Sequence, residues 1–275
     1  MMEIYIIAML ALLGLCFGSF ANAAVWRLKT KKDIVHDRSE CVHCHHKLSA
    51  ADLVPVFSWL WLRGKCRYCK KPISPQYPLV EAVVALYFVG SYLVWPVALG
   101  NTYHVFEFIL WLVYGVALAI LFVYDLRWQI LPDRLVKPLI ALGSIQFVAR
   151  AFNEQWTFER FFAELLLALL AIAGLYWVLH TVSKGAWVGY GDVKLGVFMG
   201  LVLGWENALF ALFAANLIGV LFILPGLATG KLSRKSKVPF GPFLILAFVL
   251  AGLFGDTITR VYFENLDLFM TTLML

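Results

Sequence analysis

Long tracts of apolar residues are the feature that most limits what this chain can fold into. A run of about 18 or more apolar residues is long enough to cross a bilayer as a helix. Hydrophobic residues make up 62% of the chain, whereas soluble domains have about 45–50%. Eight candidate tracts, the sixth of them short, lie at about 3–25, 79–99, 104–124, 134–152, 160–182, 192–204, 206–229 and 240–261. The sequence therefore predicts an all-α polytopic membrane protein with about eight transmembrane helices.

The tracts divide the chain into three parts. Residues 1–25 form the first apolar tract, 26–78 a polar interval with four of the five cysteines, and 79–275 the remaining tracts. The first tract ends in Ala21-Asn22-Ala23, which is typical of a signal-peptide cleavage site, but it begins with Met-Met-Glu rather than with basic residues. We expect it to remain as an uncleaved helix, because a signal peptide starts with a positively charged segment.

The positive charges lie mostly on one side of the predicted membrane. If residues 26–78 face the cytoplasm, eight spans place loops 125–134, 183–191 and 230–239 on the same side. Of the 23 Lys and Arg residues, 20 then fall on that side, as the positive-inside rule requires. The net charge of +6 thus reflects topology, and we expect no nucleic-acid partner. The loop between the first two tracts should be cytoplasmic, and the lipid bilayer should be the first partner of the chain.

The polar interval contains two Cys-x2-Cys pairs. Cys41 and Cys44 form the first, and Cys66 and Cys69 form the second, 21 residues further on. Two such pairs can surround one tetrahedral Zn²⁺ with four thiolates, which leaves no open position for catalysis. The alternative is a set of free thiols or a redox pair. A cytoplasmic location disfavours disulfides, so the spacing favours a structural zinc site, with His43, His45 and His46 as solvated turn residues.

Two aspartates lie where apolar tracts begin or end. Asp125 ends the third tract in FVYDLRW, and Asp192 opens the sixth in VGYGDVKLG. Carboxylates embedded in a membrane are functional-site candidates. Two neighbouring carboxyls share a proton, so that one can activate a water while the other polarises a peptide carbonyl. Gly189 and Gly191 would let a substrate strand approach closely.

A purely structural interpretation of these aspartates stays open at this point. Asp192 could be a helix N-cap, and Asp125 could lie at the membrane interface beside Arg127. Asp133, after Pro132, fits a capping role better than either. The residues alone leave the catalytic and structural interpretations about evenly balanced.

Six motifs in a fixed order resemble one known family, over nearly the whole chain. The motifs are GSFANAAVWRL at 18–28, the two cysteine pairs with VPVFSWLWLRGKCRYC, QYPLVE at 76–81, YDLRWQILPD at 124–133, GYGDVKLG at 189–196 and VPFGPFL at 238–244. With these motifs the chain resembles the type IV prepilin peptidases, which are bifunctional leader peptidases and N-methyltransferases. The resemblance implies a multi-pass protein of the bacterial cytoplasmic (inner) membrane whose active site faces the cytoplasm.

The resemblance also implies roles for individual residues. Asp125 and Asp192 would be the catalytic pair of a GxGD intramembrane aspartyl protease, which removes a basic leader from prepilins and pseudopilins. The new N-terminal residue would then be methylated with S-adenosylmethionine. Gly18 and Glu81 match motif positions and are the candidates for methyl transfer. Lys194 would help to position an acidic group of the substrate, although a lysine that reaches the headgroups is an equal alternative.

Other functions are less compatible with the sequence. A presenilin-like or signal-peptide-peptidase-like protease also pairs Tyr-Asp with Gly-x-Gly-Asp, but it carries a late Pro-Ala-Leu element that this chain lacks. A transporter or scaffold would need a polar path across the bilayer, and the carboxylate candidates cluster at one face instead. A peptidase without methyltransferase activity remains an alternative.

Overall fold

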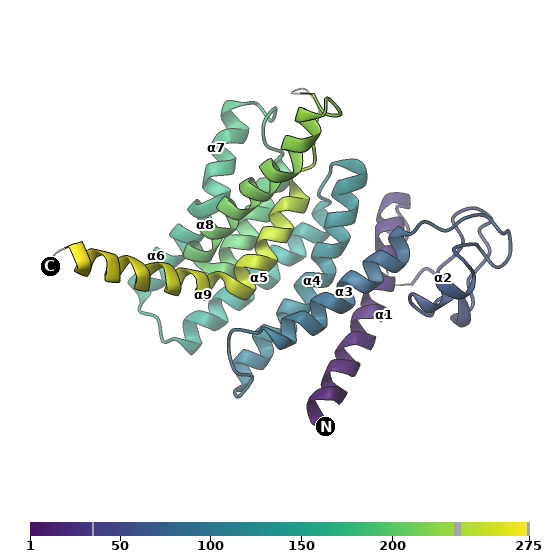
Figure 1. The fold of residues 1–275 in the computed structure, drawn as a ribbon, viewed down its shortest axis with the longest axis horizontal. Helices are drawn as coiled ribbons and strands as arrows, with labels where there is room; N and C mark the ends of the chain where they lie inside the picture. The colour runs from purple at the N-terminus through teal and green to yellow at the C-terminus, as the bar shows by residue number, and fades with distance from the viewer. Residues whose placement is uncertain (35, 234–237, 274–275) are drawn as a thin grey trace. The chain divides into compact units, whose positions relative to one another are not determined.

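The structure is a computed structural model that describes residues 1–34, 36–233 and 238–273, with side chains as far as residue 261. Its described part is helical, and only isolated bridges of β-type are present there. The prediction of an all-α fold is therefore confirmed (Figure 1). The elements are α1 (Met2–Thr30), η1 (Ala50–Asp52), α2 (Phe57–Trp61), α3 (Gln76–Leu93), α4 (Thr102–Trp128), α5 (Asp133–Asn153), α6 (Phe158–Leu169), the π-helical η2 (Leu170–Gly174), α7 (Leu175–Val182), α8 (Tyr190–Ala228) and α9 (Gly241–Leu273).

Six helices in the described part are long and apolar enough to cross a membrane. They are α1, α4, α5, the continuous run from α6 to α7, α8 and α9. The predicted count of about eight differs at two places. The α3 helix, predicted as the second span, is not among the six, and the sixth and seventh predicted spans are joined in α8.

The α8 helix is broken at Gly204, at the boundary predicted between those two spans. Gly204 has φ 78° and ψ 166°, a conformation essentially restricted to glycine. A side-chain nitrogen of Arg150 donates to the carbonyl oxygen of Val202 at 2.6 Å. This contact satisfies a backbone acceptor that the break removes from the helical hydrogen-bond pattern.

The chain turns back at this break. Gly191 near the start of α8 and Gly241 at the start of α9 both lie against the side chain of Leu131. Gly219, beyond the break, lies beside Phe243 in the first turn of α9. The second half of α8 therefore runs back towards the level at which the first half began.

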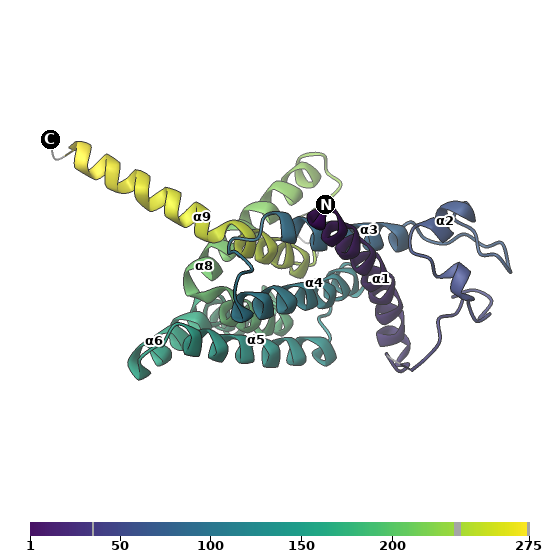
Figure 2. The ribbon, with the colours of Figure 1, turned by 90° about the horizontal axis from the view of Figure 1, so that it is seen from below.

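The chain forms two compact units, and α4 contributes to both. The first comprises Met1–Trp95 and Phe108–Tyr124, and the second Pro96–Glu107 and Asp125–Leu275. In the first unit α1 and α3 lie side by side (Figures 1 and 2). A Cβ atom at Gly14 would lie 2.5 Å from the Cα of Ala85, and one at Gly18 would lie 2.5 Å from the Cα of Glu81. Small residues thus allow the two backbones to touch, as is common between helices in membranes.

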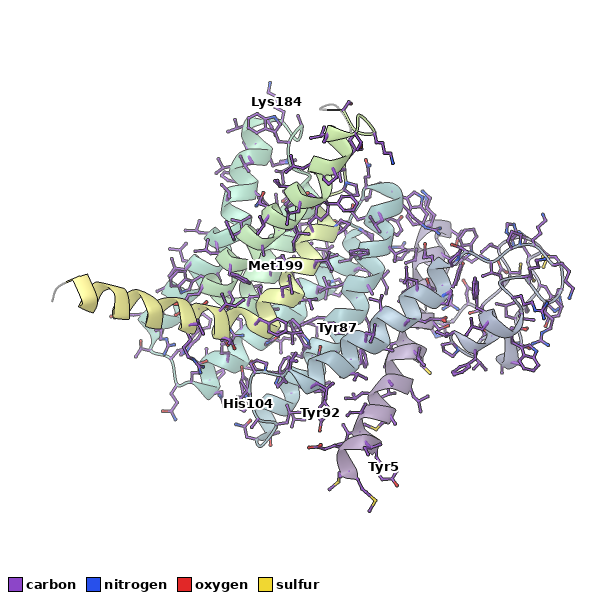
Figure 3. All side chains as sticks on the ribbon, viewed as in Figure 1. Tyr5, Tyr87, Tyr92, His104, Lys184 and Met199 are labelled. Atoms are coloured by element: carbon purple, nitrogen blue, oxygen red, sulfur yellow. The ribbon has the colours of Figure 1, made fainter. Side chains whose placement is uncertain are left out.

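The second unit is built around the first half of α8. Its buried residues include Phe198 and Met199, and its glycines pack against α5, α6 and η2. Figure 3 shows Lys184 and His104 at opposite ends of this unit. The loop before α8, which contains Lys184, therefore lies at the opposite end from the start of α4.

Candidate active site and metal centre

Asp125 lies in the last turn of α4 and is 5% exposed. The backbone N–H of Gly241, at the start of α9, donates to its carboxylate. A Cβ atom at position 241 would lie 2.6 Å from Oδ2 of Asp125, which is closer than van der Waals contact allows. The absence of a side chain at Gly241 therefore permits this contact.

Asp192 occupies the first turn of α8, three residues after the N-cap residue Gly189. Its Oδ2 accepts from the backbone N–H of Gly189 at 3.2 Å. Asp192 is thus not the N-cap, but its carboxylate satisfies an N–H at the helix start, where the helix dipole also favours negative charge. The backbone of Gly189 is extended, with φ of −71° and ψ of 147°.

The two aspartates lie close together at one end of the second unit. Leu131 packs against Gly191, next to Asp192, and against Gly241, which contacts Asp125. A Cβ atom at Gly191 would lie 3.0 Å from Cβ of Leu131, so the role of this glycine is close packing. The two carboxyls are near enough for the charge of Asp125 to act on Asp192. Two carboxyls that interact in this way favour a state in which one is protonated and the other is ionised, as general acid–base attack on a peptide requires.

Lys194 and Asp133 form an ion pair beside this site. Nζ of Lys194 lies 2.5 Å from Oδ1 of Asp133 and 4.8 Å from the ring centroid of Tyr190. Asp133 also pairs with Lys137 at 3.3 Å. Asp133 is the first residue of α5, where Pro132 is the N-cap and no side chain caps the helix. The expected capping role of Asp133 is therefore not observed, and the charge of Lys194 is paired within the protein.

Gly241 contacts Asp125, but motif spacing did not identify it as a site residue. It belongs to the motif VPFGPFL, which entered only through the family resemblance. Nothing in the local pattern of the sequence indicates that this glycine approaches a carboxylate more than one hundred residues earlier in the chain.

The four cysteines of the polar interval form a candidate metal centre in the first unit. Their Sγ atoms all lie within 4.8 Å of one another, and those of Cys41 and Cys69 are 3.9 Å apart. Tetrahedral Zn–S bonds of about 2.3 Å require sulfur atoms about 3.8 Å apart. The thiols are all free, with sulfurs much farther apart than the roughly 2 Å of a disulfide. These residues can therefore bind a metal ion.

The two cysteine pairs have the same turn geometry. The N–H of Cys41 donates to the carbonyl of His46 at 3.0 Å, and the N–H of Cys66 donates to that of Lys71 at 2.9 Å. His45 and Lys70, each one residue after a pair, have φ of 56° and 60°. Each pair is thus a tight knuckle that directs its two thiols to a common point.

Backbone donors also favour the ionised thiol that a metal requires. Burial disfavours the Cys41 thiolate, but the N–H groups of Cys44 and His43, together with the thiols of Cys66 and Cys44, outweigh burial and lower the pKa of Cys41 to about 7. The N–H of His46 favours the Cys44 thiolate in turn, but burial and the neighbouring cysteines outweigh it and raise the pKa of Cys44 to about 11. His43, His45 and His46 are exposed, as predicted, and His46 stacks on Tyr68.

Asp52 connects the interval between the knuckles to the second knuckle. Its carboxylate lies 2.6 Å from Nε of Arg67 and 3.1 Å from the hydroxyl of Tyr68, and it accepts from Ser49. Burial opposes ionisation, but these donors outweigh it and lower the pKa of Asp52 to about 2. The sequence analysis did not identify this residue, because its partners are 15 and 16 positions away.

The two candidates for methyl transfer touch each other in the contact of α1 with α3. Gly18 packs directly on the backbone of Glu81. Oε2 of the buried Glu81 accepts from the N–H of Val56 at 2.7 Å. Val56 has φ 62° and ψ −52°, an unfavourable conformation for a β-branched residue. Glu81 thus holds the start of α2 in place, and Gly18 allows the close approach of the helices.

Comparisons with known proteins match both halves of the chain. Residues 12–95 match the bacterial peptidase A24 N-terminal domain, and residues 112–224 match the type IV leader peptidase family. No solved structure matches the chain.

Three relatives are named prepilin leader peptidase/N-methyltransferase. The protein of Aeromonas hydrophila is 36% identical over 232 residues, which cover 83% of this chain and 75% of that protein. The protein of Stutzerimonas stutzeri is 30% identical, and the match covers 92% of each chain. The protein of Bacillus subtilis (strain 168) is 31% identical over 94% of this chain and 98% of its own.

Proposed function

Because the chain belongs to the type IV leader peptidase family, we propose that it removes the leader peptide from prepilins and pseudopilins and methylates the new N-terminal residue. The observation that carries the peptidase assignment is the pairing of Asp125 with Asp192 at one end of the second unit. The names of the relatives supply the substrate class and the methyltransferase activity.

The two aspartates would act as one acid–base unit. One carboxylate accepts a proton from a water, and the other carboxyl, still protonated, donates to the oxygen of the scissile carbonyl. The resulting tetrahedral intermediate collapses when the leaving amine gains a proton. Gly241 N–H and Gly189 N–H hold the two carboxylates in fixed positions, so little reorganisation is needed during the reaction.

Exchange of either aspartate for asparagine tests the pair. Purified Asp125→Asn and Asp192→Asn should each remove no leader from a prepilin in proteoliposomes, because asparagine cannot transfer a proton. Both variants should insert and unfold like the parent protein, since asparagine keeps the size and the acceptor oxygen of aspartate. Cleavage by either variant at the parental rate would exclude the pair as the catalytic group.

The proposed site faces the cytoplasm of a bacterium from the inner membrane. Support comes from the charge distribution, with 20 of 23 Lys and Arg residues on the side of residues 26–78. A prepilin has a basic leader followed by an apolar helix, so its cleavage site would lie at the membrane boundary. A carboxyl pair at the ends of membrane helices can therefore reach that bond while the apolar helix of the prepilin stays in the bilayer.

The four cysteines would hold one structural Zn²⁺. Thiolate ligands, sulfur spacing and two matching knuckles suit this ion. Metal analysis of the purified full-length protein should give about one zinc per chain for a four-cysteine site, and less for Cys66→Ser. An equal zinc content in the variant would exclude the site.

Methyl transfer would use S-adenosylmethionine, which supplies an activated methyl group to the amine that cleavage exposes. Gly18 and Glu81 would contribute by positioning α2 rather than by contact with the methyl donor, given their packing against each other and Val56. Incubation of a pre-cleaved pilin with labelled S-adenosylmethionine tests the activity separately from cleavage. If no label is transferred to the pilin, the protein is a peptidase without methyltransferase activity.

A further inference from the structure

The short helix α2 presents an apolar face that no described part of the protein covers. Phe57 is 66% exposed, Leu60 58% and Trp61 85%. The opposite face is anchored, because Nε1 of Trp59 donates to the carbonyl of Ile73 and its ring lies against Gly64. Three large apolar side chains are therefore held outward on a fixed element, which is costly in water.

The position of α2 along the helical pair α1–α3 indicates what surrounds this face. The residue before α2, Val56, is hydrogen-bonded to Glu81, and Glu81 touches Gly18. Gly18 precedes the end of α1 at Thr30 by twelve residues, or about 18 Å of helix. The helix α2 therefore starts beside α1 rather than beyond its C-terminal end (Figure 1).

Polar contacts indicate where the membrane boundary crosses this pair. Asn22 accepts from Gln76 and donates to the carbonyl of Tyr77, one helical turn from Gly18 towards the end of α1. From this contact towards the N-terminus of α1 and towards the C-terminus of α3, the only charged residues of the two helices are Glu3 and Glu81. The start of α2 thus lies close to the boundary between headgroups and hydrocarbon, where aromatic residues of membrane proteins gather.

We propose that Phe57, Leu60 and Trp61 insert into the bilayer interface and hold the cysteine knuckles against the membrane surface. The exposed Arg63, Lys65, Lys70 and Lys71 follow α2 in the chain and suit the anionic headgroups of a bacterial leaflet. In this proposal a phospholipid bilayer covers the apolar face of α2. The proposal depends on membrane insertion of α1 and not on the peptidase or methyltransferase activity.

Photo-crosslinking in the full-length protein tests this insertion. A benzophenone amino acid replaces Trp61 in one variant and His36, which is exposed in the linker after α1, in the control. Both proteins are placed in vesicles of phosphatidylethanolamine and phosphatidylglycerol that carry a radiolabelled acyl chain. We expect about tenfold more lipid adduct at position 61 than at position 36, because only the interface offers acyl chains.

Two outcomes would overturn the proposal. Equal lipid adducts at positions 61 and 36 would mean that α2 is solvated. An adduct at position 61 that maps to another segment of the chain would mean that protein covers the face. Zinc content measured on both variants checks that the knuckles remain folded.

A second observation concerns Tyr176 in α7, whose hydroxyl is buried without a hydrogen-bond partner among the residues that the structure describes. The residue is 4% exposed and follows the π-helical turn η2, a feature often found at functional sites. Its ring lies 6.1 Å from that of Phe240, the neighbour of Gly241. The charge of Asp192 acts on its hydroxyl. Tyr176 thus lies beside the start of α9, which contacts Asp125, and within electrostatic range of Asp192.

The geometry points to Tyr176 as a further catalytic residue, which donates a hydrogen bond to the scissile carbonyl oxygen as charge develops there. A buried hydroxyl without a partner is unfavourable unless a ligand supplies one. This assignment rests on the proposed peptidase function. It gives the site a donor that binds the transition state more strongly than the substrate.

The variant Tyr176→Phe separates this role from packing. We expect kcat for leader removal to fall about 100-fold, as for loss of one such donor, with KM little changed. The unfolding temperature should stay the same or rise, since an unpaired buried hydroxyl is lost. Tyr92→Phe in the other unit is the matched control. A parental kcat in Tyr176→Phe would overturn the catalytic role of Tyr176 but not the peptidase function. Cleavage by Asp125→Asn or Asp192→Asn would overturn the peptidase function itself.

Discussion

At the scale of single residues, Asp125 depends on a neighbour that has no side chain. The N–H of Gly241 reaches its carboxylate, and a Cβ atom there would lie 2.6 Å from Oδ2. The same Cβ atom would also lie 3.5 Å from Cδ2 of Leu131. A methyl group at position 241 would therefore displace the carboxylate or the start of α9.

We predict that Gly241→Ala lowers the rate of leader removal by about 100-fold or more, because small misplacements of a catalytic group have effects of that size. Leader loss is followed by intact mass on the purified protein in proteoliposomes. The control is Gly90→Ala, where a Cβ atom meets nothing within 4 Å. Parental cleavage by Gly241→Ala would show that the contact has no role in positioning Asp125.

Asp52 is the residue on which the shape of the polar interval depends. Its pKa of about 2 lies below the usual value of 3.8 because donors outweigh the effect of burial. A lowered pKa means that the ionised form stabilises the fold at neutral pH, and that this contribution is lost only as the pH falls from about 4 to about 2. Asp52→Asn should therefore weaken the knuckles equally at pH values of about 7 and about 5.5.

We expect Asp52→Asn to destabilise the zinc-bound interval by about 1 kcal/mol, a value reduced for the partial exposure of Arg67. Zinc release to a chelator should become about fivefold faster, which corresponds to that free energy. Asp37→Asn serves as the control, because this exposed carboxylate accepts a local hydrogen bond from the N–H of Asp33. An unchanged release rate in Asp52→Asn would argue against Asp52 as the connecting residue.

At the scale of secondary-structure elements, the break in α8 is set by one backbone conformation. Gly204 has φ 78°, which an L-residue adopts at a cost of about 1–3 kcal/mol. The Arg150 side chain satisfies the freed Val202 carbonyl but does not relieve this cost for another residue at position 204. The reversal of the chain between the two halves of α8 therefore requires glycine.

Gly204→Ala should lower the free energy of unfolding by about 2 kcal/mol, within the range expected for such a conformation. Thermal unfolding of the detergent-solubilised protein measures this change. Gly100→Ala, at a position with open space and no left-handed conformation, should leave the unfolding temperature nearly the same. An unaltered temperature for Gly204→Ala would mean that the helix can close across the break.

Local patterns in the sequence predicted some features of the fold and the site, but not others. Hydropathy predicted the helical spans, and the Cys-x2-Cys spacing predicted four thiols at one point, because both signals are contained in short stretches of chain. The contacts of Gly241 with Asp125 and of Asp52 with Arg67 join segments that are distant in the sequence. Composition and motif spacing therefore do not predict these contacts. The burial of the Tyr176 hydroxyl likewise depends on which face η2 and α7 turn inward.

At the scale of the whole molecule, the number of membrane passes decides on which side each loop lies. Among the described residues, six helices satisfy the length and apolarity of a span. The α8 helix has 39 residues, or about 58 Å of helix if it were straight, nearly twice the hydrocarbon thickness of about 30 Å. With α3 as a span and α8 as a reversed pair, eight passes result. The loop before α8 and residues near 231 would then be cytoplasmic, and Gly204 would lie near the opposite surface.

Sandwich fusions of alkaline phosphatase, which is active only outside the cytoplasm, test this arrangement on the complete chain. Fusions after Gln155 and after Gly204 should be active, and fusions after Gly185 and after Lys231 should be inactive, because the positive charges cluster near the latter two. The fusion after Gly204 is the decisive one. If α8 crossed only once, residues before and after the break would share a single helix, and an active enzyme inserted there could not reach the outside without a reversal of the chain. If the fusion after Gly204 is stable but inactive while the fusion after Gln155 is active, the chain has fewer than eight membrane passes.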